Sequence, residues 1–198
     1  MSYRGEFWSS LIQNSLKINP AVFEAFKDDY TFGRNSKPIQ NEQTHRFTTR
    51  GSKRIIKEDS LILKDIPRTF PHLNELFEEV HHLTESLVCI LGAFQNYRPD
   101  CGYVQGMCYL AAMLLIHQTR PEDCYVTFCN LVVSSKFHLI YDFYTAKHQT
   151  VLATYKVFWK LLRNHCPNLY INMKDNDATC KFFLFEWIIT LFSNSFDI

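Results

Sequence analysis

Apolar positions along most of the chain recur every three or four residues, which is the spacing of an amphipathic helix. Near the start, apolar residues from Phe7 to Leu16 follow this spacing, and Pro20 ends the stretch. Pro20 also suits the first turn of a second helix, which continues through residues 22–30. No long segment alternates between apolar and polar residues as a half-buried strand would. The pattern therefore predicts an all-α domain.

The later part of the chain carries the strongest helical pattern. Residues 80–97 place apolar side chains at helical spacing, and residues 104–117 are apolar on nearly every face, which predicts a buried central helix. Further helices are predicted from Pro121 to Val132, from Val151 to Asn164 and from Cys180 to Phe192, with a polar turn over residues 172–177.

One long polar stretch interrupts the helices. Residues 31–57 are rich in turn-forming and basic residues, and we predict a surface loop inside a single domain that spans residues 1–198. From His45 to Arg68 the local net charge is +4, whereas the whole chain carries only +1. A near-neutral chain is not typical of a nucleic-acid-binding protein, so we expect no nucleic-acid partner.

The seven cysteines favour a reducing compartment. Their number is odd and they form no CxxC pair, so buried thiols are a simpler interpretation than disulfides or a zinc site. His81 and His82 are adjacent and would point about 100° apart on a helix, so we predict no metal site. The chain start lacks an apolar signal region, and the apolar run 107–116 is too short to span a bilayer. We therefore expect a cytoplasmic protein.

Arg68 is the first candidate functional residue. A short helix is predicted to begin near Leu61 and to stop at Ile66, because Pro67 disfavours helical backbone at the residue before it. Pro71 stiffens the other side, so Arg68 has little conformational freedom to lose on meeting a phosphate. Its planar guanidinium can bind phosphate oxygens at two points. The alternative, that Arg68 only pairs with Asp65 at a helix end, stays open.

Gln105 is the second candidate. Gly102 gives a flexible entry, and the predicted position of Gln105 is the first turn of the central helix, where free N–H groups favour anions. An ordinary polar residue at the start of a helix is the alternative. Arg4 and Trp8 form a third motif, in which Phe7 and Trp8 are interpreted as core anchors of the first helix.

Three motifs occur together in this order: Arg4-Gly5-x-x-Trp8, then Ile62-x-x-Asp65-x-x-Arg68-Thr69, then Tyr103-x-Gln105-Gly106-Met107. This combination resembles the TBC domain, a GTPase-activating module that acts on Rab-type small GTPases. The resemblance implies an all-α, multi-helix TBC-type fold. It also implies further helices beyond Ile198, so we expect a chain whose N-terminal part is complete and whose C-terminal helices are missing.

The resemblance implies roles for single residues. Arg68 would stabilise charge on the transferring γ-phosphoryl group, and Gln105 would orient the attacking water. Asp65 would hold Arg68, and Tyr103 would support the loop of Gln105, with Thr69 and Gly106 as further supporting motif positions. One departure is Arg98-Pro99, where the family often has Asn-Pro.

The function expected from the resemblance is activation of a GTP-bound Rab-family GTPase in membrane traffic. No independent reaction is expected, and no cofactor beyond the GTP and Mg²⁺ that the partner carries. Membrane contact would be indirect, through the Rab, at the periphery of endomembranes. Two alternatives stay open: a catalytically incompetent TBC-like scaffold that binds a Rab, and a generic helical adaptor.

Overall fold

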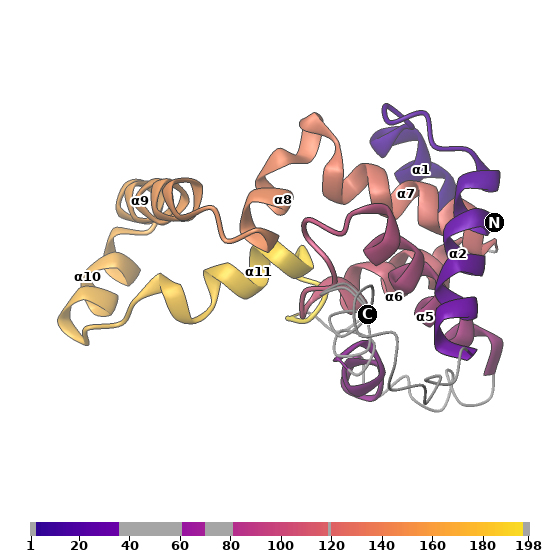
Figure 1. Ribbon diagram of the computed structural model, residues 1–198. Coiled ribbons are helices and arrows are strands. Elements are labelled where there is room, and N and C mark those ends of the chain that lie inside the picture. Colours follow the sequence, from indigo (N-terminus) through magenta and orange to yellow (C-terminus); the bar gives the residue numbers. More distant parts are fainter. Residues whose placement is uncertain (1–2, 36–60, 70–80, 119, 196–198) are drawn as a thin grey trace, which may run out of the picture.

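The computed structural model describes residues 3–35, 61–69, 81–118 and 120–195. Within these ranges the chain forms helices and no strand, which confirms the all-α prediction (Figure 1). The α-helices are α1 (Tyr3–Ile12), α2 (Pro20–Asn35), α5 (His81–Tyr97), α6 (Met107–His117), α7 (Pro121–Val133), α8 (His138–Tyr144), α9 (His148–His165), α10 (Pro167–Asp175) and α11 (Leu184–Thr190). Short 3₁₀ turns are η1 (Ile66–Arg68), η3 (Ser135–Phe137) and η4 (Cys180–Phe182).

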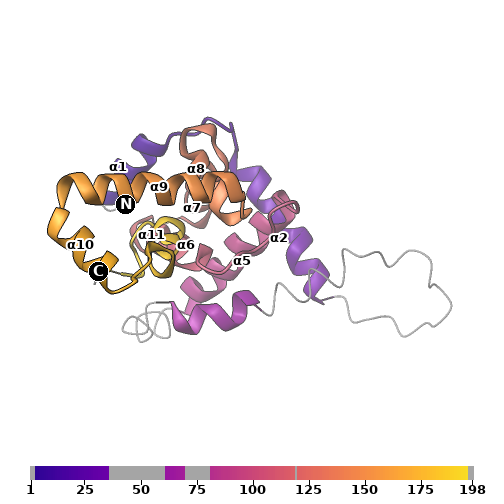
Figure 2. The ribbon, with the colours of Figure 1, turned by 90° about the vertical axis from the view of Figure 1, so that its left-hand side faces the viewer.

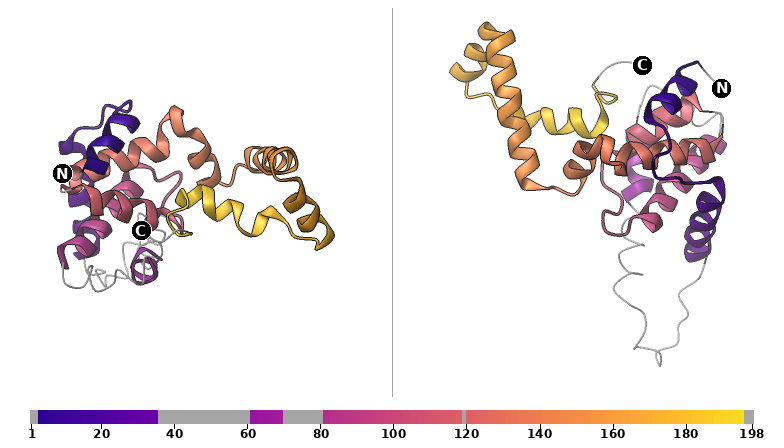
Figure 3. Two further views of the ribbon diagram at one scale, coloured as in Figure 1. Left: turned by 180° about the vertical axis from the view of Figure 1, so that it is seen from behind. Right: turned by 90° about the horizontal axis from the view of Figure 1, so that it is seen from above.

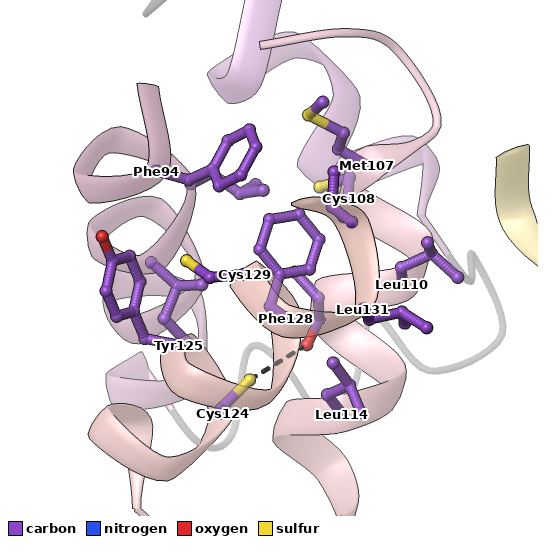
Figure 4. Packing of buried hydrophobic residues seen from close by; sticks show 14 of the residues in the cluster. Phe94, Met107, Cys108, Leu110, Leu114, Cys124, Tyr125, Phe128, Cys129 and Leu131 are labelled. Carbon is purple, nitrogen blue, oxygen red and sulfur yellow. Dashed lines mark hydrogen bonds between the residues drawn. The ribbon is translucent and has the colours of Figure 1, made fainter. Parts of the chain in front are cut away.

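The core lies where α5, α6 and α7 pack together (Figure 4). Phe94 of α5 meets Phe128 of α7 edge to face, with ring centroids 5.1 Å apart, and both are fully buried. The Cys124 thiol donates to the carbonyl of Ala111, 3.6 Å away. Seven of the eleven residues of α6 are buried, which confirms the predicted central helix. This helix is therefore the frame on which the candidate site is built.

Gly5 lets α1 approach the end of α6. A Cβ atom at Gly5 would lie 2.2 Å from the backbone oxygen of His117, which is a prohibitive overlap. The ring of Trp8 packs edge-on against His117, at 5.0 Å between centroids. Trp8 is half-buried and packs against the core, as predicted, whereas Phe7 is 58% exposed and the prediction of a core anchor there is wrong. The helical period turns Phe7 away from α6 when Trp8 faces it.

Several predicted boundaries differ from the structure. Helix α2 continues to Asn35, five residues into the predicted loop, and residues 36–57 of that loop lie outside the described residues. The sequence reading missed α8 and α10, and α10 occupies part of the predicted turn at 172–177. These helices are only seven and nine residues long, too short for a clear apolar period. The predicted helix 180–192 is η4 followed by α11, and Leu191 and Phe192 adopt positive φ beyond it.

Helices α9 and α10 form an arm that projects from the body (Figure 1), and in Figure 2 this arm lies in front of the body. The two views in Figure 3 show the arm standing apart from α1, α2, α5, α6 and α7. No residue of α9 is fully buried. An aromatic cluster holds the arm together, because Trp159 packs on Tyr170 at 5.8 Å and Phe158 on Phe183 at 5.7 Å. Helix α8 is tied to α11 by the Tyr144 hydroxyl, which donates to the Ile189 carbonyl at 2.6 Å.

Asp142 connects α8 to the start of the arm. Its side chain is 7% exposed, and its carboxylate accepts hydrogen bonds from the Thr150 hydroxyl at 2.7 Å and from Lys147 Nζ at 3.3 Å. His138 Nε2 lies 3.1 Å away. Burial raises the pKa of Asp142, but the hydrogen bonds from Thr150 and Lys147 and the charges of His138 and Lys147 outweigh it, so the net pKa is lowered. The carboxylate is thus bound in its ionised form.

We expect Asp142→Asn to lower the free energy of unfolding at pH 7 by about 1–2 kcal/mol, the scale of a hydrogen bond to a charged group. A depressed native pKa stabilises the fold above the unfolded pKa of about 3.9, and this contribution is lost as the pH falls through the native value. The difference in the free energy of unfolding between wild type and variant should therefore become smaller below about pH 4. Urea unfolding at pH 7 and pH 3 measures it, with the exposed Asp175→Asn as control. A gap that is constant across this pH range would contradict the assignment.

Candidate functional site

Arg68 lies at the end of the turn η1, directly after a helical segment over residues 61–65. Ile62 is fully buried and anchors this segment to the core, and Thr69 is buried on the other side. Pro67 occupies an early position of η1, so the α-helix gives way to a 3₁₀ turn where the sequence predicts. Arg68 itself is exposed. The segment therefore holds an exposed guanidinium between two buried side chains.

Two tyrosines fix the Arg68 segment to the α6 region. The Tyr103 hydroxyl donates to the Asp65 carboxylate at 2.8 Å. The Tyr109 hydroxyl donates to the backbone carbonyl of Arg68 at 3.2 Å. These bonds join residues that are 38 and 41 positions apart in the sequence. Because Gln105 lies between the two tyrosines along the chain, both candidate residues are attached to one region of the surface.

The Asp65 carboxylate points to Tyr103 rather than to Arg68. In the described part of the chain no ion pair joins Asp65 to Arg68, so the expected contact between them is not formed. Burial raises the pKa of the Tyr103 hydroxyl far above its ordinary value, and the neighbouring Cys108 and Asp65 add to the shift. The tyrosine therefore stays protonated and remains a donor to Asp65. The guanidinium of Arg68 is left to face solvent.

Thr69 supports the Arg68 segment on its buried side. Its hydroxyl and its backbone N–H both donate to the Asp65 carbonyl, at 2.9 and 3.0 Å. Its side chain adjoins the Cys108 thiol, whose pKa burial raises to about 11. Thr69 thus caps the short helix that carries Asp65, and it supports the Arg68 turn without facing solvent.

Gln105 lies in the turn that precedes α6, not in the first turn of the helix as predicted. The helix begins at Met107, two residues later, with Gly106 as the capping residue at φ 103°. The backbone N–H of Met107 donates to the Val104 carbonyl at 3.1 Å, which closes the turn around Gln105. The Gln105 side chain is exposed. It therefore sits on a tight turn next to the free N–H groups of a helix start.

Gly106 brings this turn against α11. A Cβ atom there would lie 2.9 Å from Cδ1 of Ile189, and the φ of 103° is one that side-chain-bearing residues rarely adopt. Ile189 is in turn held by the hydrogen bond of Tyr144 to its carbonyl. The glutamine turn thus rests on a packed contact between α6, α8 and α11.

We expect Gly106→Ala to lower the free energy of unfolding by about 1–3 kcal/mol, the cost of holding a side chain at such a φ. Ile189→Val removes the atom that a new Cβ would approach most closely, so it tests the steric part separately. If backbone strain at position 106 dominates, Gly106→Ala should lower the free energy of unfolding nearly as much in the Ile189→Val background as in the wild type. Urea unfolding of the four proteins of this cycle gives the comparison. An unaltered stability of Gly106→Ala would contradict the strained backbone.

The turn before Tyr103 is held by an arginine that the sequence singled out only as a departure. Arg98 binds the Asp100 carboxylate at two points, 2.8 and 2.7 Å, and stacks on the ring of Tyr141 at 4.7 Å. The Tyr141 hydroxyl also donates to Asp100. These hydrogen bonds lower the pKa of Asp100, whereas burial, followed by the bond to Asp100, raises that of Tyr141 to about 12. Arg98 thus joins the turn to α8, a role that asparagine could not fill in the same way.

Comparison with known proteins shows which family this chain belongs to. The chain matches the Rab-GTPase-TBC domain family over residues 1–198. The chain belongs to this family. It is 33% identical to TBC1 domain family member 12 of Xenopus tropicalis over 98% of the chain, and 32% identical to TBC1 domain family member 14 of Homo sapiens over the same share. Drainin of Dictyostelium discoideum is 32% identical over 97% of the chain.

The TBC domain described here spans only part of these relatives. It covers 28% of the Xenopus protein, 27% of the human protein and 50% of drainin. Among its described residues, no helix is long and apolar enough to cross a membrane, and no group of three or more potential metal ligands comes together.

The TBC domain brings most of the predicted site residues together. Asp65, Thr69 and Tyr103 are bonded to one another or to the Arg68 segment, and Gly106 shapes the turn of Gln105. Arg4 and Trp8 lie apart from them, where α1 meets the end of α6. Trp8 packs on His117 there and Arg4 is exposed, and their role as a structural motif stays a prediction.

Sequence reasoning missed Tyr109, Tyr141 and Ile189. Tyr109 falls in an apolar run and looked like an ordinary core residue, although it is half-buried and hydrogen-bonded to Arg68. Its position six residues after Tyr103 was the only feature of the sequence that could have suggested a second hydrogen bond to the Arg68 segment. Tyr141 and Ile189 lie on short helices, where no local pattern indicates a link to the site.

Proposed function

We propose that this TBC domain accelerates GTP hydrolysis by a Rab-family GTPase in its GTP-bound form. The main support is the exposed Arg68, held in place by Tyr103 and Tyr109 beside the turn of Gln105. Phosphoryl transfer depends on positioning and on charge stabilisation rather than on covalent chemistry by the activator. An arginine and a glutamine that are held on turns next to packed helices are suited to both tasks.

In this proposal Arg68 enters the partner's nucleotide site and binds oxygens of the transferring γ-phosphoryl group. The two-point geometry of the guanidinium offsets the negative charge that develops there. Asp65 acts through Tyr103, because that hydrogen bond fixes the helical segment from which Arg68 extends. The domain has no reaction of its own, since GTP and Mg²⁺ belong to the partner and the TBC domain needs no cofactor.

Gln105 would hold the attacking water in line with the phosphorus. The tight turn and the contact of Gly106 with Ile189 limit the positions that its side chain can reach. A positioned water lowers the barrier because little orientational entropy is left to lose on reaction. The setting we propose is Rab regulation in membrane traffic, on the cytoplasmic side of endomembranes.

Single-turnover GTP hydrolysis against a panel of Rab proteins tests the proposal. We expect strong stimulation of at least one GTP-loaded Rab by the wild-type domain. Binding of a GTP-loaded Rab without any stimulation would favour the scaffold alternative. Neither binding nor stimulation across the panel would reject a Rab as the partner of this chain.

A further inference from the structure

The connection between α5 and α6 carries Gln105, and we call this connection, residues 98–106, the glutamine loop. The Gln105 side chain is exposed, so its position depends on the backbone that carries it. Backbone hydrogen bonds close local turns at the start of the loop and where it enters α6, but these bonds join residues that are close in sequence. Contacts with other elements must therefore set where the loop lies.

Helix α8 holds the first end of the glutamine loop through Tyr141. The ring of Tyr141 lies under the Arg98 guanidinium, with 4.7 Å between the ring centroid and Cζ. The Tyr141 hydroxyl donates to the Asp100 carboxylate, which Arg98 binds at two further points, 2.8 and 2.7 Å away. The start of the loop is thus attached to α8 by hydrogen bonds and by a stacked ring.

Helix α8 supports the other end of the loop through Tyr144. This tyrosine is 5% exposed, and its hydroxyl donates to the Ile189 carbonyl at 2.6 Å. Ile189 in turn lies against Gly106, where an added Cβ atom would be 2.9 Å from its Cδ1. Burial raises the pKa of the Tyr144 hydroxyl well above its ordinary value, and the nearby Cys101 and Cys108 add to the shift. The hydroxyl therefore stays protonated and remains a donor.

Both tyrosines lie on one side of α8, because they are three residues apart in a helix. Ile140 and Phe143 of the same helix are buried in the hydrophobic core, and α8 packs on α7 and α11 (Figure 1). A helix that is itself fixed in the core thus holds the glutamine loop at both ends. Gln105 lies between the two points of attachment and is next to the second.

We propose that Tyr141 and Tyr144 are positioning residues for Gln105, and that α8 sets through them where the glutamine lies before a partner binds. Neither side chain touches the nucleotide or the water in this proposal. Their loss should therefore slow hydrolysis and leave the affinity for a GTP-bound Rab unchanged. A shift of about 1 Å at a catalytic group can lower a rate about 10²-fold. The effect on hydrolysis rests on the proposed function, whereas the attachment of the loop to α8 does not.

Hydrogen exchange of the 198-residue protein, measured by NMR, tests the attachment without a GTPase. Tyr141→Phe removes only the hydroxyl, so we expect faster exchange of the Gly102 amide, which closes the turn at the start of the loop. Tyr144→Phe should increase exchange of the Met107 amide, which closes the turn around Gln105. If exchange in the loop increases no more than exchange in α7 in both variants, the proposal is overturned.

Thr127→Val is the control for a general loss of stability. The Thr127 hydroxyl is buried near the C-terminal end of α6, where it donates to the Asp123 carbonyl at 2.9 Å and accepts from Gln118 at 3.0 Å. We expect this variant to be less stable than the wild type, with no selective increase of exchange in the glutamine loop. A selective increase there in the control would show that any loss of stability loosens the loop, which overturns the specific role of α8.

Single-turnover hydrolysis with a Rab that the wild type stimulates measures the effect on the reaction. Tyr141→Phe and Tyr144→Phe should each lower the rate at saturating domain about 10-fold or more, with an unchanged Kd for the GTP-bound Rab. Either change combined with Gln105→Ala should cause little further loss, because the tyrosines act through Gln105. Losses that multiply in the double variants would contradict a role through Gln105.

The two measurements distinguish a wrong role of α8 from a wrong function. If the wild type stimulates no Rab, the proposed function fails, and hydrogen exchange alone decides whether α8 holds the loop. If the wild type is active and both variants keep its full rate despite faster exchange in the loop, positioning of Gln105 by α8 is wrong. Circular dichroism checks folding, and the half-buried Tyr141→Phe site remains decisive if Tyr144→Phe does not fold.

Discussion

Arg68→Ala is expected to reduce GAP-stimulated hydrolysis by about 10³–10⁵-fold, the range over which arginine fingers accelerate GTP hydrolysis. The side chain is exposed and makes no ion pair with Asp65 in the described part of the chain. Its loss should therefore change the free energy of unfolding by less than about 0.5 kcal/mol. Single-turnover hydrolysis with a responsive Rab, together with urea unfolding, separates the two effects.

Two further variants sharpen this test. Arg68→Lys should also fail to stimulate GTP hydrolysis, because an ammonium group cannot bind two phosphate oxygens in a fixed plane. Lys64→Ala removes an exposed cation four residues earlier on the same segment and should leave the rate unchanged. Stimulation by Arg68→Ala or Arg68→Lys at the wild-type level would remove Arg68 from the proposed mechanism, even if another residue still activated the Rab.

Gln105→Ala is the second large effect, with an expected loss of about 10²-fold or more in the hydrolysis rate. Its proposed partner is a water molecule, so affinity for the GTP-bound Rab should remain close to that of the wild type. Stopped-flow hydrolysis and a binding titration on the same Rab measure the two quantities. Gln149→Ala, an exposed glutamine on the arm, is the matched control.

A Rab variant gives an independent view of Gln105. If Gln105 replaces the switch glutamine of the GTPase, a Rab with leucine at that position should remain partly responsive to the wild-type domain. An unresponsive Rab of this kind, combined with full activity of Gln105→Ala, would assign the positioning of water to the GTPase itself.

The positions of Arg68 and Trp8 could be predicted because local chemistry sets them. Pro67 ends the helix through a steric rule that acts between neighbours, and the structure has the α-helix give way to η1 there. The helical period places Trp8 toward the core. The same period cannot say which of two adjacent aromatic residues faces inward, and the prediction for Phe7 was wrong for that reason.

The supports of the site could not be predicted, because they depend on contacts distant in sequence. Asp65 has a basic residue three positions away, and only the fold shows that its carboxylate meets Tyr103 instead. The placement of Gln105 was wrong by two residues because Gly106 adopts a φ of 103° where α11 packs against it. A periodic pattern carries no information on such a contact.

The burial of the cysteines has a practical consequence for labelling. A thiol reacts with electrophiles as the thiolate, and a pKa of about 11 at Cys108 leaves only about 10⁻⁴ of that group ionised at pH 7. Burial likewise raises the pKa of Cys124, Cys129 and Cys180. Of the seven cysteines, all within the described residues, only Cys166 is exposed, between α9 and α10. The native chain thus offers one exposed thiol on the arm for an environment-sensitive fluorophore, far along the sequence from Arg68 and Gln105, while Cys89 and Cys101 are partly buried.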